Sequence, residues 1–282
     1  MKSIVFLDLD GTFWDMEQVP ESALKAVQKA EENGHLILTN TGRSRSSAES
    51  ALEGLPLSGQ VYSAGSEIWL DGKQIFCQPL GAARTHRLLD EINKWDVAVT
   101  LEGSNTLFHN QKARDHMYEK SKDGTIVSAL MNAKDISEIK EEEFADIMKI
   151  SLHGLKPGQI DDLLARENMV ITEFSIFKEN SGVNGEITDR NLTKGTAFKP
   201  ILEGLGQEEK NYQTIAFGDS ENDLPMFETA EIAVAMGNAD PAIQDKADYV
   251  TEPIHEDGLY HAFERLGLLD NNAAPEWIKK QK

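Results

Sequence analysis

Short apolar runs alternate with helical patterns at both ends of the chain, and this alternation constrains the fold more than any other feature. The runs typical of strands buried on both faces are SIVFL (residues 3–7), HLIL (35–38) and YQTIAF (212–217). Between them lie helical segments such as residues 20–34, with Pro20 near the start and Gly34 at the end. Strands that alternate with helices predict a parallel sheet with right-handed crossovers, and therefore an α/β, Rossmann-like core.

The middle of the chain, from about residue 81 to residue 190, has a different pattern. Its helical segments are longer and more polar, and its strand-like segments alternate more between apolar and polar residues. A length of 282 residues is compatible with one large domain or two ordinary ones. We therefore predict a core built from residues 1–80 and 191–282, with an α+β domain inserted at residues 81–190.

The charge of the chain limits its partners. It has 28 basic and 48 acidic residues, and the net charge of −20 repels nucleic acid and anionic membrane surfaces. A phosphorylated substrate would be repelled as well, so a phosphate site here needs a local cation. The single cysteine, Cys77, excludes an intrachain disulfide and fits a reducing compartment.

The apolar segments are too short for a membrane protein. None approaches the roughly 18 apolar residues that a membrane-spanning helix needs. Asp8 and Asp10 interrupt the first apolar run, which argues against a signal peptide. We expect a soluble cytoplasmic protein.

Polar residues directly follow three of the predicted strands. The segments are Asp8-Leu9-Asp10-Gly11, Thr39-Asn40-Thr41-Gly42 and Gly218-Asp219-Ser220-Glu221-Asn222-Asp223. In an open parallel sheet the carboxyl ends of the strands lie along one edge, where ligands bind. If the three strands are neighbours, four carboxylates meet around Thr41. They belong to Asp8, Asp10, Asp219 and Asp223.

Four carboxylates at one place repel one another unless they are protonated or neutralised by a cation. Oxygen-only ligands at an open, acidic edge suit Mg²⁺ that shares its coordination with water and a phosphate group. A single acid after a strand is more commonly a turn residue or a helix cap, and Asp10 before Gly11 fits a turn. Because several strands end in the same way, we predict a magnesium site.

Lys194 stands at an unusual place in the sequence. Thr193 is placed to cap a helix, which would put Lys194 in the first helical turn. A cation there opposes the helix dipole by roughly 0.3–1 kcal/mol. Either the side chain is solvated and tolerates this penalty, or it faces the acidic edge and supplies the cation that a phosphate needs. The residue pattern leaves both interpretations open.

Four segments in this order resemble the signature motifs of the haloacid dehalogenase (HAD) superfamily. They are Asp8-Leu9-Asp10-Gly11-Thr12, Thr41-Gly42-Arg43, Lys194-Gly195 and Gly218-Asp219-Ser220-Glu221-Asn222-Asp223. The long insert between the second and third motifs is similar to the α/β cap of the Cof-type phosphatase branch. MGNA (236–239) and EDGL (256–259) also match the C-terminal pattern of that branch. The resemblance covers nearly the whole chain and is weakest in the insert.

The resemblance implies a role for each motif residue. Asp8 would be the nucleophile that forms an aspartyl-phosphate. Asp10 would protonate the leaving group and then act as general base for water. Mg²⁺ would be held by Asp8, the backbone carbonyl of Asp10 and Asp219, with Asp223 supporting it from nearby. The residues that would bind the phosphate oxygens are Thr41, Gly42, Lys194 and Asn222.

Two departures from the family pattern are visible. Ala64-Gly65-Ser66 replaces the usual Asn-Gly-Ala, and Phe13-Trp14-Asp15 stands where relatives have leucines. We expect neither to touch the core chemistry, although both leave the identity of the substrate open.

These observations lead to the expectation of a Mg²⁺-dependent phosphatase that acts on small phosphorylated metabolites such as sugar phosphates. A phosphomutase or phosphotransferase with the same aspartyl-phosphate is the alternative within enzymes. A phosphorylatable receiver domain would also gather acids, a threonine and a lysine around Mg²⁺. Receivers are usually less than half this length, however, and their first strand is followed by adjacent acids rather than alternating ones.

Overall fold

The computed structural model describes residues 2–121, 128–173, 182–206 and 212–270. The chain forms two compact units, and each consists of segments that are separate in the sequence. The first unit comprises Met1–Gly42, Glu53–Cys77 and Thr193–Lys282. The second comprises Arg43–Leu52 and Gln78–Leu192. Within the described ranges, no helix has both the length and the apolar composition needed to cross a membrane.

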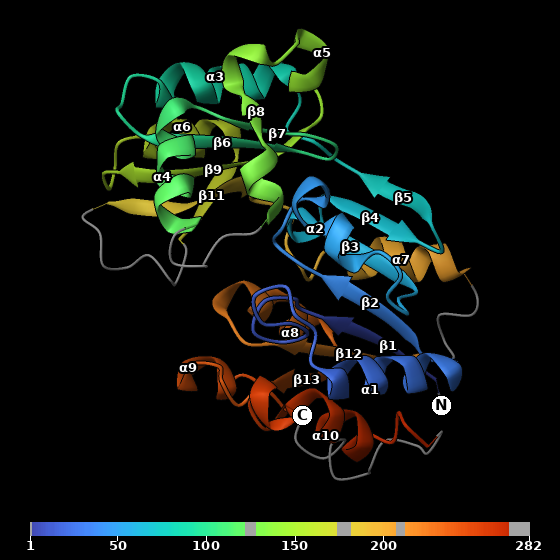
Figure 1. Ribbon diagram of the computed structural model, residues 1–282. Helices are drawn as coiled ribbons and strands as arrows, with labels where there is room; N and C mark the ends of the chain where they lie inside the picture. Colours follow the sequence, from blue (N-terminus) through green and yellow to red (C-terminus); the bar gives the residue numbers. More distant parts are fainter. Residues whose placement is uncertain (1, 122–127, 174–181, 207–211, 271–282) are drawn as a thin grey trace. The chain divides into compact units, whose positions relative to one another are not determined.

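An eight-stranded sheet forms the centre of the first unit (Figure 1), with the strand order β14-β13-β12-β1-β2-β3-β4-β5. Its strands are β1 (Lys2–Leu7), β2 (Leu36–Asn40), β3 (Gly59–Tyr62), β4 (Glu67–Leu70), β5 (Lys73–Cys77), β12 (Tyr212–Gly218), β13 (Ile232–Ala235) and β14 (Tyr249–Val250). Neighbouring strands from β14 to β3 run parallel, whereas β3, β4 and β5 form antiparallel pairs. The parallel sheet built from both ends of the chain confirms the predicted α/β fold class.

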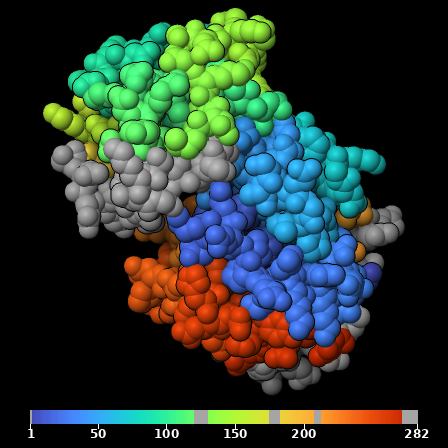
Figure 2. Space-filling view, in the orientation of Figure 1, coloured from blue at the N-terminus to red at the C-terminus, as the bar shows by residue number. Residues whose placement is uncertain are grey.

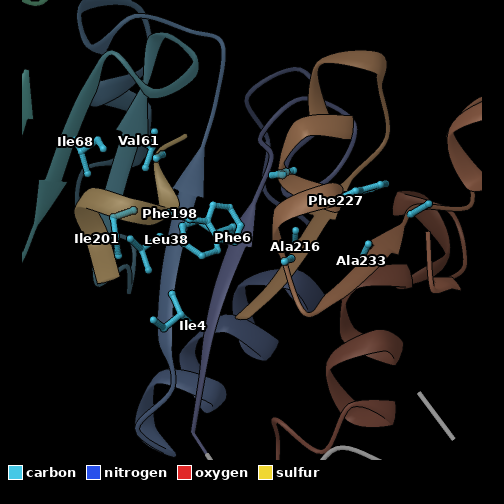
Figure 3. Close-up of a cluster of buried hydrophobic side chains, with 14 of the residues drawn as sticks. Ile4, Phe6, Leu38, Val61, Ile68, Phe198, Ile201, Ala216, Phe227 and Ala233 are labelled. Carbon is cyan, nitrogen blue, oxygen red and sulfur yellow. The ribbon is translucent and has the colours of Figure 1, made fainter. Parts of the chain in front are cut away.

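Helices cover both faces of this sheet. They are α1 (Glu21–Glu32), α7 (Phe198–Leu205), α8 (Leu224–Thr229), α9 (Pro241–Gln244) and α10 (Gly258–Arg265). On one face, α7 and α8 close an apolar core in which the rings of Phe6 and Phe198 stack 3.8 Å apart (Figure 3). On the opposite face, Phe217 of β12 contacts Phe263 of α10. Helices α1 and α10 pack side by side, so segments from the two ends of the chain adjoin on the surface (Figure 2).

The second unit is built around a six-stranded sheet, in which the strand order is β10-β11-β9-β6-β7-β8. Its strands are β6 (Ala98–Gly103), β7 (Leu107–His109), β8 (Lys134–Asp135), β9 (Ile147–Leu155), β10 (Met169–Glu173) and β11 (Val183–Asp189). The helices of this unit are α2 (Arg45–Leu52), α3 (Ala82–Ile92), α4 (Gln111–Ser121), α5 (Glu141–Phe144) and α6 (Asp161–Glu167). Leucine and isoleucine side chains of α3 and α6 pack with one face of the sheet in a second apolar core. The two units therefore have separate cores.

Helix α2 belongs to the second unit, although the sequence places residues 43–52 in the predicted core. Ser44 Oγ donates a hydrogen bond to Glu102 Oε2 at 2.8 Å, and Ser46 Oγ donates one to the Gly103 carbonyl oxygen at 2.6 Å. Glu102 and Gly103 lie at the end of β6. These contacts across the sequence group α2 with the inserted unit, which hydrophobic patterning could not show.

Candidate functional site

The strands that carry the acidic motifs are neighbours in the first sheet. Strand β1 lies between β12 and β2, and Leu7 is paired with Phe217 on one side and with Thr39 on the other. The backbone N–H of Asp8 continues the ladder by donating to the Phe217 carbonyl oxygen at 3.0 Å. Because the three strands are parallel, their carboxyl ends deliver the motif residues to the same edge.

Three carboxylates converge at this edge. Asp8, Asp219 and Asp223 each offer an oxygen atom, and these atoms lie within 4.8 Å of one another. Asp8 and Asp223 are buried, and Asp219 is half-buried. The sequence predicts four carboxylates at this edge, and the structure groups three of them, because Asp10 is not part of the cluster.

Lys194 pairs with two of the three acids. Its Nζ atom lies 2.5 Å from Asp8 Oδ1 and 2.6 Å from Asp223 Oδ1, and its side chain is buried. Burial alone would lower the pKa of Lys194, but the carboxylates of Asp223 and Asp8 outweigh burial and raise the pKa above its usual value. Of the two interpretations open from the sequence, the structure shows the one in which Lys194 faces the acidic edge.

The backbone around Lys194 differs from the sequence prediction. Helix α7 begins at Phe198, so Lys194 lies in the preceding turns rather than in the first turn of a helix. Thr193 interacts with Thr196 there, since the Thr196 hydroxyl donates to the Thr193 carbonyl oxygen at 2.8 Å. The amide of Asn40 at the end of β2 donates to the Lys194 carbonyl oxygen at 2.8 Å. A cation in this turn has no helix dipole of its own to oppose.

Asp223 joins the lysine to the loop after β12. Its Oδ2 atom accepts hydrogen bonds from the backbone N–H groups of Asp219 and Ser220, both at 2.9 Å, while Oδ1 contacts Lys194. A Cβ atom on Gly218 would lie only 2.4 Å from Cγ of Asp223, so the strand end must be glycine for this carboxylate to fit. Asp223 thus holds both the loop and the cation in place.

Asp219 fits closely against the first motif. Thr12 Oγ1 donates to Asp219 Oδ1 at 3.3 Å. Gly11 has a φ angle of +80°, and a Cβ atom there would approach Asp219 Oδ2 to 2.5 Å. The Gly11 carbonyl oxygen accepts a hydrogen bond from Asn238 Nδ2 at 2.9 Å. The left-handed backbone and the close carboxylate both require glycine at this position.

The electrostatics of the acids are unfavourable without a further cation. Burial and then the carboxylate of Asp223 raise the pKa of Asp8 well above its usual range. The same two causes raise the pKa of Asp219 to about 6. Among the described residues at this edge, three carboxylates face the single ammonium group of Lys194. A donor set of oxygens with an excess of negative charge fits a hard divalent cation such as Mg²⁺.

Asp10 has a different environment from the other acids. Its side chain is exposed, and its Oδ1 atom accepts a hydrogen bond from the indole Nε1 of Trp14 at 3.0 Å. Trp14 is completely buried. The segment Phe13-Trp14-Asp15 therefore contacts a residue of the first motif through Trp14. A buried indole usually needs an acceptor for its N–H group, so the sequence could have suggested that Trp14 has an acceptor nearby but not that the acceptor is Asp10.

The remaining predicted phosphate ligands lie at the ends of β2 and β12. Thr41 is buried, and its backbone N–H donates to the Val61 carbonyl oxygen at 2.9 Å. Gly42 follows it as the last residue of that segment of the first unit. Asn222 lies in a short 3₁₀ turn and is half-buried, and its Oδ1 accepts from Ser220 Oγ at 2.9 Å. Their roles toward a phosphate group stay predictions.

Comparison with known protein families gives one match over most of the chain. The sequence pattern of the family described as haloacid dehalogenase-like hydrolase matches residues 5–263. This range contains every motif residue of the acidic edge.

Several relatives match along nearly their whole length. YkrA of Bacillus subtilis, provisionally named a phosphatase, is 27% identical over 267 residues, which cover 94% of this chain and 98% of YkrA. The 5-amino-6-(5-phospho-D-ribitylamino)uracil phosphatase YcsE of the same organism is 26% identical, with 92% of this chain and 93% of YcsE covered. A phosphoglycolate phosphatase of Methanothermobacter thermautotrophicus is 25% identical, with 93% and 97% covered.

Solved structures share the fold. BT1666 from Bacteroides thetaiotaomicron, a phosphatase of the HAD superfamily, superposes with a TM-score of 0.77 at 22% identity, covering 95% of this chain and 96% of BT1666. The HAD subclass IIB sugar phosphatase BT4131 gives a TM-score of 0.76 at 22% identity, covering 95% of this chain and 100% of the compared one. At this level of identity the likeness establishes the architecture alone.

Proposed function

The chain belongs to the haloacid dehalogenase-like hydrolases, and from this premise we propose that it is a Mg²⁺-dependent phosphatase of small phosphorylated metabolites. Hydrolysis of phosphoric monoesters agrees with the names of the relatives YcsE and phosphoglycolate phosphatase. Sugar phosphates are the substrate class that we propose to test first. A cytoplasmic location stays a prediction from the sequence.

One observation carries the proposal. The carboxylate of Asp8 stands at the carboxyl edge of the parallel sheet, 2.5 Å from a buried ammonium group and close to two further carboxylates. A carboxylate in such a place is suited to nucleophilic attack on phosphorus. The ammonium group of Lys194 also gives an anionic substrate a favourable partner at an edge that would otherwise repel it.

In the first half of the proposed reaction, an oxygen of Asp8 attacks the phosphorus atom of the substrate. A bond forms between this oxygen and phosphorus, and the bond between phosphorus and the leaving-group oxygen breaks. Asp10 donates its proton to that leaving oxygen, so the product departs as a neutral alcohol. Asp8 then carries the phosphoryl group as an aspartyl-phosphate.

In the second half, Asp10 acts as the base. It takes a proton from a water molecule as the water oxygen attacks phosphorus, and the bond between phosphorus and Asp8 breaks. Inorganic phosphate leaves, Asp8 is again a carboxylate, and Asp10 is again protonated. The side chains of Thr41, Lys194 and Asn222, with the backbone at Gly42, are proposed to bind the phosphate oxygens during both steps.

A divalent cation would be held by Asp8, Asp219 and the backbone carbonyl of Asp10, with Asp223 supporting the arrangement. When bound, it would offset the excess of negative charge and polarise the phosphoryl group. Asp223 already directs one oxygen to Lys194 and the other to two backbone N–H groups. We therefore assign it to holding the site together rather than to direct coordination.

The second unit is proposed to act as the cap domain that the family resemblance implies, with the substrate specificity residing partly in it. The expected boundaries, residues 81–190, lie inside one of its segments, Gln78–Leu192. The structure adds α2 to this unit.

The test is release of inorganic phosphate from a panel of sugar phosphates and one aryl phosphate, with Mg²⁺ present. Asp8→Asn should reduce turnover by at least about 10³-fold, since it removes the nucleophile. Asp71→Asn is the matched control, because Asp71 lies in the exposed turn between β4 and β5. The proposal fails if the wild-type protein releases no more phosphate than Asp8→Asn. Transfer of the phosphoryl group to a second metabolite instead of water would indicate a phosphotransferase.

A further inference from the structure

We propose that Trp14 is a positioning residue for proton transfer, because its indole N–H group holds the carboxyl group of Asp10 in one orientation. The inference rests on the proposed function, in which Asp10 exchanges a proton with the leaving group and with water. It adds to that function a residue outside the motif positions and explains a segment where this chain departs from its family pattern.

The contact joins a buried donor to an exposed acid. Trp14 Nε1 lies 3.0 Å from Asp10 Oδ1, a normal distance for a hydrogen bond to a carboxylate. The Trp14 side chain is completely buried, whereas Asp10 is exposed. A hydrogen bond from this buried donor favours one rotamer of the Asp10 side chain.

The donor is fixed because the loop folds back on itself. The backbone N–H of Trp14 donates to the Leu9 carbonyl oxygen at 2.9 Å, and the Trp14 carbonyl oxygen accepts from the Gly11 N–H at 2.9 Å. Asp10 and Trp14 also form an isolated β-bridge. These bonds fix the backbone of Trp14, and the complete burial of the ring restricts rotation of the side chain.

The chemistry of the indole distinguishes the two oxygens of Asp10. An indole N–H donates and cannot accept, so the oxygen that it faces, Oδ1, must remain an acceptor. The carbonyl oxygen of a protonated carboxyl group is a better acceptor than its hydroxyl oxygen, so this bond favours Oδ2 as the oxygen that carries the proton. This oxygen would give its proton to the leaving group and later take one from water. Orienting the reactive oxygen in advance lowers the entropic cost of each transfer.

A purely structural role for Trp14 makes a different prediction. If the indole only filled space, its truncation would lower stability or reduce all activities by a common factor. If it positions the acid, the loss must depend on how strongly the leaving group needs a proton. Alkoxide leaving groups need protonation, whereas a nitrophenolate leaves readily without it.

The experiment compares Trp14→Phe with the wild-type protein on an alkyl phosphate and on p-nitrophenyl phosphate, with kcat/KM measured for both. General acid catalysis contributes roughly 10²–10⁴-fold, so we expect the variant to lose about 10- to 100-fold on the alkyl phosphate. The loss on the aryl phosphate should stay within about 3-fold.

Trp69→Phe is the matched control. Trp69 Nε1 also donates to a carboxylate of the first unit, Glu67 Oε1, at 2.8 Å. This variant removes the same chemical group and the same kind of bond, and it should leave the ratio of the two kcat/KM values unchanged.

The proposal is overturned if Trp14→Phe lowers both kcat/KM values by the same factor or changes neither. If Trp14→Phe does not fold, site-specific replacement of Trp14 by β-(3-benzothienyl)alanine removes the N–H group and keeps the two-ring shape. The same selective loss is expected for it, and an equal loss on both substrates again refutes the inference. A wild-type protein that hydrolyses neither substrate would contradict the proposed function instead, so the two failures can be told apart.

Discussion

The ammonium nitrogen of Lys194 lies 2.5 Å from Asp8 Oδ1, although the two residues are 186 positions apart in the sequence. Both groups are buried, and the same nitrogen contacts Asp223 Oδ1 at 2.6 Å. One ammonium group therefore joins three segments that are distant in the sequence, those that carry Asp8, Lys194 and Asp223. Charged groups that are buried together are costly to separate, because each loses its partner without regaining water.

Replacing Lys194 by methionine tests this dependence. Lys194→Met keeps most of the side-chain volume but leaves Asp8 and Asp223 buried without their cation. Breaking a buried ion pair costs about 3–5 kcal/mol, and we expect a loss of this size at neutral pH, measured by urea denaturation. Lys199→Met is the control, since Lys199 is exposed on the neighbouring helix α7. Equal stability of the Lys194→Met variant and the wild-type protein would show that the pairing contributes nothing.

Asp219 predicts how the stability of the metal-free protein depends on pH. Its pKa is raised to about 6 from the ordinary value of 3.8, so the folded state binds this proton more tightly than the unfolded state. The free energy of unfolding should therefore fall as the pH rises between about 4 and 6, through this group. Denaturation of wild-type protein and Asp219→Asn in chelator across this range measures the effect. The free energy of unfolding should fall less with pH in Asp219→Asn than in the wild-type protein. An identical pH dependence of the two proteins would contradict a raised pKa of Asp219.

Added Mg²⁺ should offset the repulsion among the carboxylates of Asp8, Asp219 and Asp223 and so stabilise the folded protein. A cation that binds only the folded protein stabilises it by mass action, so the melting temperature should rise with Mg²⁺ concentration. Asp219→Asn should lose most of this rise, and Asp71→Asn should retain it. A melting temperature that is insensitive to Mg²⁺ in the wild-type protein would argue against a metal site at this edge.

Gly11 offers a separate test of the fit between the first motif and Asp219. Gly11→Ala places a methyl group in a left-handed conformation, which costs roughly 1–2 kcal/mol, and it also displaces the Asp219 carboxylate. We expect lower stability together with a loss of Mg²⁺-dependent activity. Gly54 has the same φ angle of +80° with no atom within 4 Å of an added Cβ, so Gly54→Ala carries the backbone strain alone. If Gly11→Ala and Gly54→Ala retain equal activity, the close approach of residue 11 to Asp219 does not affect activity.

The fold and the grouping of the acids were predictable because both follow from local patterns. Runs such as residues 3–7 and 212–217 are largely apolar, which is typical of strands in a parallel sheet covered by helices on both faces. Parallel strands then bring their carboxyl ends to one edge, whatever their separation in the sequence. The positions of Asp8, Asp219 and Asp223 after those runs were therefore enough to group them in space, whereas Asp10 follows the same strand and lies outside the cluster.

The features that escaped prediction depend on contacts between side chains. The backbone takes turns at Lys194 before α7 begins at Phe198, and Thr193 Oγ1 accepts from the Thr196 N–H within these turns at 3.3 Å. Helix α2 joins the second unit through a bond between Ser44 and Glu102, which are 58 positions apart. The contact of Trp14 with Asp10 requires knowledge of which way a buried ring points. Periodicity contains none of this information.

The assignment of α2 to the second unit has a consequence for engineering by domain exchange. The chain passes between the units four times, after Gly42, Leu52, Cys77 and Leu192. A chimera that takes only residues 78–192 from a homologue would separate β6 from its native α2 and lose the bond between Ser44 and Glu102. Transplanting residues 43–52 along with them keeps that partnership intact. Exchange of the second unit therefore requires two separate segments, and only Gly42 separates the first junction from Thr41.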